Sequence, residues 1–332
     1  MDALVLVGGE GTRLRPLTEA TPKQLLPVAG VAMIERVVRH LAGHGVGHVV
    51  LSMGYRPDAF VEAYPDGMCA GVEITYAIEP ELLDTAGAVR FAAREAGLQE
   101  TFLVVNGDVL TELDVSALVE FHRARDAQAT ISLTPVDDPS AYGVVPTEDD
   151  GKVIAFIEKP PRDEAPTNLI NAGTYVLEPS VLDLVPEGRR VSIERETFPL
   201  LVTARRLYAL SSDAYWIDTG TPASYLQANL DVVDRAGGAP VLGDGVTVAP
   251  DAVVARSVVG QAGRIEAGAS VRDSVVLPGA CIGADAVVRG SVLGRGVTVG
   301  AGAHVVDCTV LGDGVCVEPG ATLSGARVPE PA

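Results

Sequence analysis

The chain has 332 residues, enough for two domains of ordinary size or one large domain, and its 47% of hydrophobic residues predict a substantial core rather than a disordered chain. It contains no uncharged apolar run of about 18 residues, so the sequence excludes a membrane-spanning helix and we expect a cytoplasmic protein. The formal net charge of −19 argues against nucleic acid or an anionic membrane as the main partner.

Strand-like and helix-like segments alternate from the N-terminus to about residue 235. The strand-like segments are short, β-branched and apolar on both faces, as buried parallel strands are: 3–7, 48–53, 72–78, 101–106 and 129–136. The segments 33–45, 85–97 and 114–126 carry apolar residues at helical spacing. This alternation predicts an α/β fold with a doubly wound, Rossmann-like sheet, which binds ligands at the carboxyl ends of its strands.

The pattern changes after "RAGGAP" (235–240), which we interpret as a linker. Beyond it, aliphatic residues recur every five or six positions and small residues fill the turns. The recurring positions are Val248, Val254, Val259, Ile265, Val271, Leu277, Ile282, Val288, Leu293, Val299, Val305, Leu311, Val317 and Leu323. This period predicts a left-handed parallel β-helix of hexapeptide repeats with these side chains in its interior. We therefore expect an α/β domain over 1–235 and a β-helix domain over 241–328.

A glycine-rich loop follows the first predicted strand, in "LVLVGGEGTRLRPLT" (4–18). The loop is not a P-loop, because no Lys-Ser or Lys-Thr pair follows the glycines, and the dinucleotide pattern GxGxxG would need glycine where Leu14 stands. Glycines let backbone amides approach phosphates closely, Arg13 offers a forked donor, and Lys23 adds a compact second charge. The stretch therefore predicts a polyphosphate site.

The stretch from Gly8 to Pro27 resembles the opening motif of the sugar-1-phosphate nucleotidyltransferases, which reads close to G-G-x-G-T-R-L-x-P-L-T…P-K-x-L-L-P. Four later stretches resemble further motifs of that family, in the family's order: 104–110, 156–160, 171–179 and 215–229. The resemblance covers residues 3–230. It implies a nucleotidyltransferase domain that uses a nucleoside triphosphate, a sugar 1-phosphate and Mg²⁺, and a hexapeptide tail is a common appendage in this family.

The resemblance also implies roles for individual residues. Arg13, Lys23 and Asp108 would be catalytic, and Asp108 and Asp218 would hold Mg²⁺ through hard oxygen ligands. The implied nucleotide-binding residues are Leu6, Gly8, Gly9, Gly11, Thr12, Arg13, Glu79, Thr85, Ala86 and Gly87. The implied sugar-phosphate-binding residues are Gly143, Glu158, Lys159, Asn171 and Gly173. Taken singly, each has a plainer interpretation: the aspartates could cap turns, and Glu158 and Lys159 could form a solvated ion pair.

The implied reaction is in-line attack of a sugar 1-phosphate oxygen on the α-phosphorus of the triphosphate, with loss of pyrophosphate. A phosphate monoester has a second pKa of about 6, so the nucleophile is already charged at neutral pH and needs no general base. The site must instead align two anions that repel each other and neutralise charge in the transition state.

Base choice is expected within residues 72–88, where the guanylyl members of the family carry a motif similar to E-x-P-L-G-T-A-G. The Glu79 carboxylate could accept both the N1–H and the 2-amino donors of guanine, whereas uracil and thymine offer one donor between two carbonyls. Guanine is thus favoured, and the resemblance of "TAG" (85–87) and of residues 170–199 to the members of the family that use mannose 1-phosphate implies GTP and mannose 1-phosphate as substrates and GDP-mannose as product. Asp84 stands where the motif has glycine, and thymidylyl or uridylyl transfer to glucose 1-phosphate remains the alternative.

Two other functions stay open. A catalytically silent relative could bind nucleotide-sugars and regulate a partner, although such a protein could lose the charged site residues that this chain keeps. The β-helix could also be an acyltransferase, but it has a single histidine, His304, and lacks an evident extension to close an acyl-donor site. A scaffold is the favoured interpretation. The small and aliphatic faces of the β-helix predict a homo-oligomer.

Overall fold

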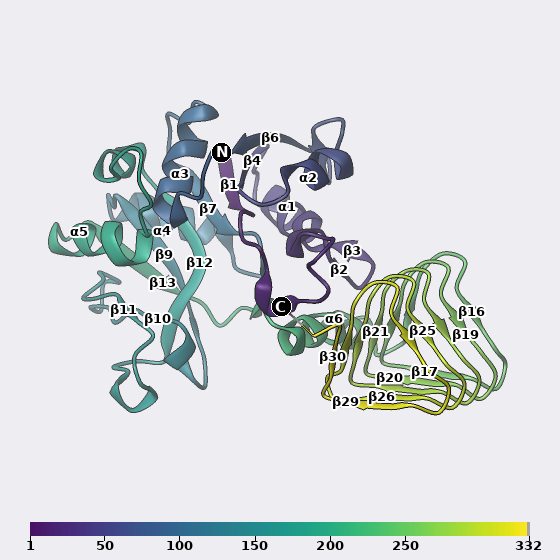
Figure 1. The fold of residues 1–332 in the computed structure, drawn as a ribbon. Coiled ribbons are helices and arrows are strands. Elements are labelled where there is room, and N and C mark those ends of the chain that lie inside the picture. Colours follow the sequence, from purple (N-terminus) through teal and green to yellow (C-terminus); the bar gives the residue numbers. More distant parts are fainter. Residues whose placement is uncertain (331–332) are drawn as a thin grey trace. The chain divides into compact units, whose positions relative to one another are not determined.

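The computed structural model of the chain describes residues 1–330 (Figure 1). By their internal contacts these residues form two units. Unit 1 comprises Met1–Gly9 and Ile34–Trp216, and unit 2 comprises Glu10–Met33 and the chain from Ile217 onward. This division by contacts is not the same as the domain boundary expected at residues 235–241, which stays a prediction.

Unit 1 is built on a ten-stranded sheet in which four adjacent strands, in the order β7, β1, β4 and β6, run parallel. Their bounds are β1 Asp2–Leu6, β4 His48–Met53, β6 Val72–Ile78 and β7 Phe102–Asn106. These four strands confirm the predicted ones. The register sets Leu6 beside both Ser52 and Asn106, so three strands end together at the edge where a doubly wound sheet binds ligands.

The other half of this sheet is mixed. β12 (Leu169–Leu177) runs antiparallel to both β7 and β9 (Ala129–Pro135), and β13 (Leu207–Ser211) pairs parallel with β9. Between residues 135 and 169, all of which the structure describes, no α-helix provides a crossover, so the chain returns antiparallel. The expected strict alternation is therefore wrong after residue 136, although the expected strand at 129–136 is present. The short strands of the sheet are β5 Met68–Cys69, β10 Gly143–Val144 and β11 Ile157–Glu158.

The three predicted helices of unit 1 are confirmed as α1 (Met33–Gly43), α3 (Asp84–Glu95) and α4 (Val115–Ala124). Their buried residues follow helical spacing, and α3 packs against β1, β4 and β6. The Asp114 carboxylate caps α4 by accepting the Ala117 N–H at 2.9 Å. Two short helices were not anticipated: α2 Pro57–Ala63 and α5 Phe198–Thr203.

Unit 2 contains one long helix and three stacks of very short strands. The helix is α6 (Pro222–Arg235), which begins with a capping box between Thr221 and Ser224. The strands in the stacks are β15 Val241–Leu242, β16 Thr247–Val248, β17 Val253–Ala255, β18 Val258–Val259, β19 Arg264–Ile265, β20 Ser270–Arg272, β21 Val275–Val276, β22 Cys281–Ile282, β23 Val287–Arg289, β24 Val292–Leu293, β25 Thr298–Val299, β26 His304–Val306, β27 Val310–Leu311, β28 Cys316–Val317, β29 Thr322–Ser324 and β30 Arg327–Val328. The remaining strands of the chain are β2 Pro27–Val28, β3 Val31–Ala32, β8 Val109–Thr111 and β14 Trp216–Asp218.

The stacks form three parallel sheets, each of which takes every third strand from β15 to β30, as the hexapeptide period predicts. Partners along a sheet are 17 residues apart, as Val259 and Val276 are, except in one turn, where Leu293 pairs with Leu311. The extra residue of that turn lies at a corner, where Asp307 and Cys308 both have positive φ.

Two predicted interior positions differ from the structure: Val248, in the first turn, is 36% exposed, and another position is wrong by a single residue. Val276, and not Leu277, stands in the ladder between Val259 and Leu293 and belongs to the interior cluster. Because side chains alternate between the two faces of a strand, a shift of one residue exchanges interior and exterior. The handedness expected for the β-helix stays a prediction.

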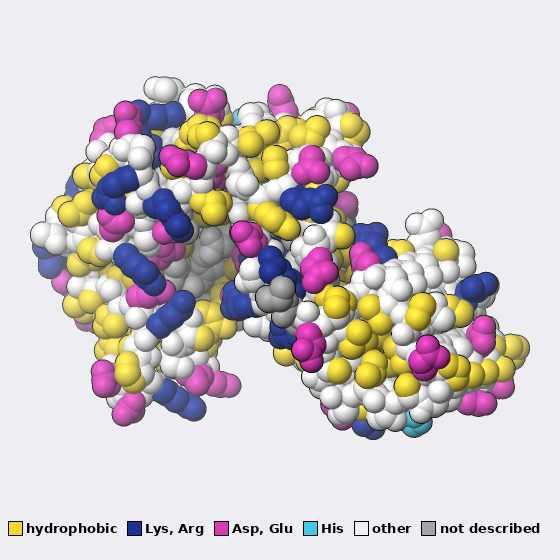
Figure 2. Space-filling view, in the orientation of Figure 1, with side chains coloured by type: hydrophobic (Ala, Val, Ile, Leu, Met, Phe, Trp, Pro, Cys, Tyr) yellow, Lys and Arg dark blue, Asp and Glu magenta, His cyan; other side chains and the backbone are white. Residues whose placement is uncertain are grey.

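The outward side chains of the four inner strands of the sheet that begins with β15 are valines, and they are covered within the chain. None of Val258, Val275, Val292 and Val310 is more than 4% exposed, and α6 packs against β18. Hydrophobic side chains gather over the β-helix in Figure 2, whereas basic and acidic side chains are interspersed on the visible face of unit 1. In residues 1–330, no helix is long and apolar enough to cross a membrane.

Candidate active site

The first predicted site residues of unit 1 lie where β1 and β7 end side by side. The Gly107 N–H donates to the Leu6 carbonyl at 3.0 Å, and a Cβ on Gly107 would lie 2.9 Å from that oxygen and 2.8 Å from the Val7 side chain. Only glycine fits at this position. The half-buried Asp108 follows directly, so the predicted metal-binding carboxylate is held beside the start of the glycine-rich loop, where Gly9 is exposed.

A bulge in β12 holds the predicted sugar-binding residues Asn171 and Gly173. Gly173 has a φ of 76°, and a Cβ there would lie 2.6 Å from the Asn106 side-chain nitrogen. The Asn171 amide accepts the Gly173 N–H at 3.0 Å and donates to the hydroxyl of the buried Tyr175 at 2.8 Å. Asn106, at the end of β7, was not singled out from the sequence, although it lies inside the motif at 104–110.

Glu158 and Lys159 lie at the short β10–β11 pairing. Glu158 stands opposite Gly143, and the Lys159 N–H donates to the Tyr142 carbonyl at 3.0 Å. Lys159 has a φ of 50°, an uncommon conformation for a residue with a Cβ and one that often occurs at functional sites. The Lys159 ammonium lies 3.6 Å from the Glu158 carboxylate, and the Arg195 guanidinium lies 4.0 Å from the same oxygen. Glu158 and Lys159 thus form a partly exposed ion pair, and their contact with a sugar phosphate stays a prediction.

Glu79 lies beside the glycine-rich loop, although more than 70 residues separate the two in sequence. A Cβ on Gly8 would lie 3.6 Å from one Glu79 oxygen, which accepts the Ser52 hydroxyl at 3.3 Å. The other oxygen accepts the Leu83 N–H at 3.0 Å. Burial raises the pKa of Glu79, and the two hydrogen bonds oppose that effect. Each carboxylate oxygen can accept a further hydrogen bond, which the proposed recognition of guanine requires.

Thr85, Ala86 and Gly87 pack against the segment that includes Val191 and Glu194. The Thr85 hydroxyl donates to Glu194 at 2.9 Å, and the Ala86 N–H donates to the Val191 carbonyl at 2.8 Å. Gly87 is buried and its N–H donates to the same carbonyl at 3.3 Å. Packing at the start of α3 therefore accounts for these three residues, and their contact with a nucleotide stays a prediction.

The structure explains how Asp84 replaces the glycine of the family motif. Asp84 has a φ of 62°, in the left-handed region that favours glycine but that Asp tolerates better than most residues. Its carboxylate folds back and accepts the Thr85 N–H at 2.8 Å, and the residue is exposed. The turn is thus kept without glycine.

Unit 2 brings Arg13 and Asp218 together, although 205 residues separate them. A Cβ on Gly220 would lie 2.5 Å from the Arg13 guanidinium and 2.8 Å from a carboxylate oxygen of Asp218. That carboxylate also accepts the Gly220 N–H at 2.7 Å, which is the turn-capping role that a lone Asp often has. Gly220 is thus a site residue that the sequence analysis missed, although the stretch at 215–229 contains it.

The loop around Arg13 is folded tightly. Gly11 has a φ of 65°, and its carbonyl accepts the Leu14 N–H at 2.9 Å and the Thr18 hydroxyl at 2.8 Å. A Cβ on Gly11 would lie 3.3 Å from the Lys23 Cβ, so the turn that carries Arg13 begins close to the turn that carries Lys23. Thr12 is exposed at the start of the single turn that carries Arg13.

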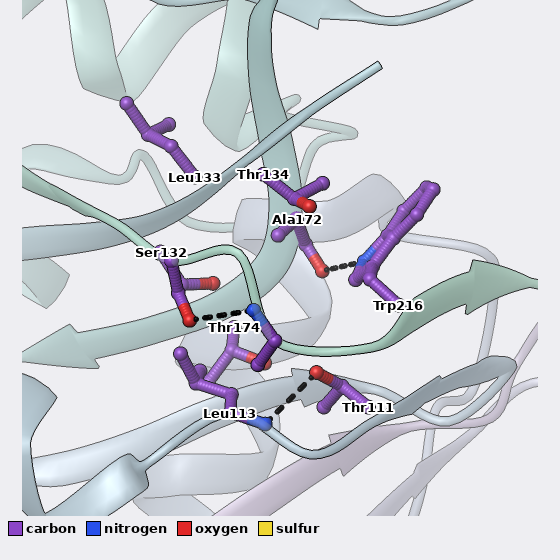
Figure 3. A pocket seen from close by; sticks show the side chains of 10 residues that line it. Thr111, Leu113, Ser132, Leu133, Thr134, Ala172, Thr174 and Trp216 are labelled. Atoms are coloured by element: carbon purple, nitrogen blue, oxygen red, sulfur yellow. Dashed lines mark hydrogen bonds between the residues drawn. The ribbon is translucent and has the colours of Figure 1, made fainter.

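A small cavity in unit 1 lies behind the predicted sugar-binding strand (Figure 3). It holds about 10 Å³, room for one water molecule, and is far too small for a nucleotide. Its lining residues are Thr111, Leu113, Ser132, Leu133, Thr134, Ala172, Thr174, Ser212, Ala214 and Trp216. The Ser132 hydroxyl is buried without a protein partner, so a water molecule here would satisfy it. The Trp216 indole N–H donates to the Ala172 carbonyl at 2.9 Å, which ties this wall to the strand that carries Asn171 and Gly173.

Asp108 and Asp218 each offer one carboxylate, and the expectation that they hold Mg²⁺ stays a prediction. In residues 1–330, no group of three or more His, Cys, Asp or Glu side chains is arranged to hold a metal ion. Mg²⁺ is commonly held by one or two carboxylates together with phosphate oxygens and water. Asp108 in unit 1 and Asp218 in unit 2, each half-buried, supply hard oxygen donors of the kind that Mg²⁺ prefers.

Comparison with known proteins agrees with the motifs in the sequence. Residues 2–235 match the family model described as Nucleotidyl transferase, and residues 237–331 match the model described as GMPPB C-terminal domain. The chain is 38% identical over 291 residues to the mannose-1-phosphate guanylyltransferase of Mycobacterium tuberculosis, covering 84% of this chain and 80% of that protein. It is 36% identical over 352 aligned positions to mannose-1-phosphate guanylyltransferase 1 of Arabidopsis thaliana, covering 99% of this chain and 95% of that protein.

Two solved structures are similar to 70% of the chain. One is HddC from Yersinia pseudotuberculosis complexed with GMP-PN, with 29% identity, a TM-score of 0.59 and 99% of that chain covered. The other is a putative glucose-1-phosphate thymidylyltransferase from Bacillus anthracis in complex with a sucrose, with 27% identity, a TM-score of 0.64 and 96% of that chain covered. With a family model that spans residues 2–235 and relatives that align along most of its length, this chain belongs to the nucleotidyl transferase family.

Proposed function

We propose that this chain transfers GMP from GTP to mannose 1-phosphate, with release of pyrophosphate and formation of GDP-mannose. The observation that carries the proposal is its similarity, over 99% of its length, to a protein named mannose-1-phosphate guanylyltransferase 1. The likeness to HddC solved with GMP-PN supports a guanine nucleotide. Retention of Arg13, Lys23, Asp108 and Asp218 supports an active enzyme over a silent relative.

The charged residues at the predicted site suit the triphosphate and its metal ion. Arg13 and Lys23 would bind its oxygens, because a guanidinium offers paired donors and an ammonium a compact charge. Asp108 and Asp218 would hold Mg²⁺, which when bound supplies positive charge to the phosphates. Gly220 allows Arg13 to lie next to Asp218, so a cation for the phosphates and a proposed metal ligand are neighbours.

The residues of unit 1 suit the base and the sugar phosphate. The partly buried Glu79 carboxylate would accept the two adjacent donors of guanine, and Lys159 would bind the phosphate of mannose 1-phosphate. Asn171 is held by Gly173 and Tyr175, so its amide is already oriented for a sugar hydroxyl. Because the phosphate nucleophile is already ionised, these residues bind and align the substrates and none of them has to remove a proton.

A substrate matrix tests the proposal. The full-length protein with Mg²⁺ is incubated with each of five nucleoside triphosphates (ATP, CTP, GTP, TTP and UTP) and with the 1-phosphates of mannose, glucose, galactose and N-acetylglucosamine, and pyrophosphate release is measured. We expect the highest kcat/KM for GTP with mannose 1-phosphate. Preference for TTP or UTP with glucose 1-phosphate would replace our assignment with the alternative. Absence of pyrophosphate release in every well would leave the regulatory relative as the better account.

A further inference from the structure

The glycine-rich loop and the β-helix belong to one unit, although more than 200 residues separate them in sequence. Unit 2 joins Glu10–Met33 to the chain from Ile217 onward, and this loop segment carries Arg13 and Lys23. The β-helix is therefore more than a distant appendage: parts of it are in direct contact with the loop that is proposed to bind the triphosphate.

The first contact is a hydrogen bond from the last strand of the β-helix. The guanidinium of Arg327, the first residue of β30, donates to the Arg13 carbonyl at 3.2 Å. Arg327 pairs with Val310 of β27, so the stacked sheet fixes the backbone from which its side chain extends. A charged donor on a carbonyl is stronger than a neutral one, and here it holds the residue whose side chain reaches Gly220.

The second contact is a close packing of the turn beyond Arg13. Gly312 follows β27, and a Cβ on it would lie 3.1 Å from the Pro16 Cβ and 3.2 Å from the Pro329 ring. The Pro16 ring therefore lies against Gly312 with no room for a side chain between them. Two residues of the β-helix, Arg327 and Gly312, thus meet the loop on both sides of Leu14.

The far end of the loop segment is held by α6. The Asn229 amide accepts the Ala29 N–H at 2.8 Å, and the Tyr225 hydroxyl donates to the Pro27 carbonyl. Arg256, at a corner of the β-helix, bonds Asp234 of α6 at 2.7 Å and Asp273 of the next corner at 2.9 Å. The loop is therefore held at its start by the β-helix and at its end by a helix that the β-helix anchors.

We propose that the last turns of the β-helix position the triphosphate loop and that Arg327 is a positioning residue that acts through Arg13. This inference rests on the proposed function of Arg13 as a ligand of the triphosphate. Arg327 donates to the backbone of Arg13, so it fixes the point from which the Arg13 side chain leaves the chain. A loop ordered before the nucleotide arrives loses less conformational freedom on binding, which favours nucleotide affinity.

The first test needs no substrate. Hydrogen exchange is measured over residues 11–26 in the wild type, R327A, R327K and the control R264A, which removes another exposed arginine of the β-helix with no contact to the loop among its hydrogen bonds and ion pairs in residues 1–330. We expect faster exchange in R327A at the amides of Leu14 and Arg15, which donate to Gly11 and Thr12, and wild-type exchange in R264A. R327K, which keeps a donor, should exchange more slowly than R327A. Equal exchange in R327A and R264A would overturn the inference.

The second test asks whether the contact matters for the nucleotide. In R327A we expect KM for GTP to rise about three- to tenfold, the range that one lost hydrogen bond produces, with KM for mannose 1-phosphate unchanged and kcat within about twofold. R327K should recover part of the loss. The variant G312A places a methyl group against Pro16 of the loop. It should raise KM for GTP while leaving Arg327 in place. An unchanged KM for GTP in both R327A and G312A would overturn the inference.

The two proposals fail in distinguishable ways. A wild-type protein that releases no pyrophosphate from GTP and mannose 1-phosphate contradicts the proposed function, whereas the exchange measurement still decides whether Arg327 orders the loop. An active wild type with an R327A variant indistinguishable from R264A contradicts only the inference. Thermal unfolding of each variant shows whether a change is confined to the loop.

Discussion

Arg13 and Asp218 both lie close to the position that a Cβ on Gly220 would take, and this arrangement is the most informative detail of the site at the residue scale. A side chain on Gly220 would meet the Arg13 guanidinium at 2.5 Å, so glycine at this position lets an arginine of the N-terminal loop lie next to the aspartate that ends β14. The arrangement sets a cation for the phosphates beside a carboxylate for Mg²⁺.

We expect R13A and D108N to lower kcat/KM by about 10²- to 10⁴-fold, because R13A removes a cation that would face the triphosphate and D108N removes a carboxylate that would hold Mg²⁺. Neither change fills or empties the core, since Arg13 is exposed and Asp108 half-buried, so thermal unfolding should stay near that of the wild type. The control R15A removes a neighbouring arginine that pairs with the exposed Glu10 and should keep nearly full activity. Near-normal activity in both R13A and D108N contradicts the assignment of the site.

We expect E79Q to lower the preference for GTP over ATP by about 10- to 100-fold, because an amide offers one acceptor where guanine presents two donors. Glutamine can keep both hydrogen bonds, because its amide oxygen can accept the Leu83 N–H and its amide nitrogen can donate to the Ser52 hydroxyl, so the fold should persist. E81Q, an exposed carboxylate two residues on, is the matched control and should keep the wild-type preference. An unchanged ratio of kcat/KM values in E79Q would move base recognition to another residue.

Sequence reasoning at the residue scale identified charged residues better than the glycines around them. Arg13, Lys23, Asp108 and Asp218 stood out because they fall, in order, within stretches that resemble the motifs of the family, although each taken singly has a plainer interpretation. Gly107 and Gly220 lay inside the same motifs, but their importance depends on what a Cβ would touch, and that is visible only when distant segments are in place. The structure also gives Thr85 a structural contact, because its hydroxyl donates to Glu194 at 2.9 Å.

At the scale of elements, a ladder of hydroxyl side chains runs along one corner of the β-helix. Ser257, Ser274, Ser291 and Thr309 are fully buried at equivalent corners of successive turns. The Ser257 hydroxyl accepts the Ser274 N–H at 3.1 Å, and the Ser274 hydroxyl accepts the Ser291 N–H at 3.2 Å. The Ser257, Ser274 and Thr309 hydroxyls thus each accept a backbone N–H of the next turn, the last from Ala326 at 3.2 Å, which links the turns where the strands are interrupted.

We expect S274A to lower the free energy of unfolding of the β-helix by about 1–3 kcal/mol, because it leaves the buried Ser291 N–H without its acceptor. The matched control is S270A, which removes a hydroxyl from β20 of the same turn at a position with no side-chain hydrogen bond among those of the described chain. Thermal unfolding followed by circular dichroism checks the prediction. Equal unfolding midpoints for the two variants would show that the ladder contributes little.

The elements were predictable where one physical signal dominated. Buried parallel strands and the six-residue period are set by local apolar patterns, so β1, β4, β6, β7 and the turns of the β-helix were expected. The reversal of β12 was not, because its direction depends on the missing helical crossover after β9. The choice between Val276 and Leu277 failed because two adjacent aliphatic residues carry no local signal of which one points inward.

At the scale of the whole molecule, stability should depend on pH through one buried and one half-buried histidine. Burial is the largest cause that lowers the pKa of both His40 and His122 below the ordinary value of 6.5. The unfolded chain therefore takes up protons before the folded one as the pH falls. The folded state is therefore most stable, as far as these two histidines are concerned, above about pH 6.5, and it loses stability progressively as the pH falls below that value. Carboxyl groups with a lowered pKa, such as that of Glu187, make the free energy of unfolding depend on pH only below their ordinary pKa of 4.5.

We expect the free energy of unfolding to fall between pH 7.5 and pH 5.5, and to fall less in H122N, which keeps a polar side chain beside Thr130 and Glu178 but cannot be protonated. Urea unfolding followed by fluorescence of Trp216, the single tryptophan, reports on unit 1. H304N, at an exposed position of the β-helix, is the control. The same pH dependence in H122N and H304N would show that His122 is not responsible.

The predicted homo-oligomer stays a prediction, and the exposed surface of the β-helix indicates which face could form its interface. The valine face of the β-helix is covered within the chain, so a homo-oligomer would have to use another surface. The first turn of the β-helix exposes Leu242, Val248 and Val253, which offers one such surface. Sedimentation of the full-length protein at several concentrations would show whether copies associate.

The activity itself is tested most directly by one comparison within the substrate matrix. The full-length protein with Mg²⁺ is given mannose 1-phosphate and either GTP or TTP, and glucose 1-phosphate with the same two nucleotides, and initial rates of pyrophosphate release are measured. We predict that GTP with mannose 1-phosphate gives the highest kcat/KM and that D108N loses this activity. Faster release from TTP with glucose 1-phosphate, or no release from any pair, would contradict the account.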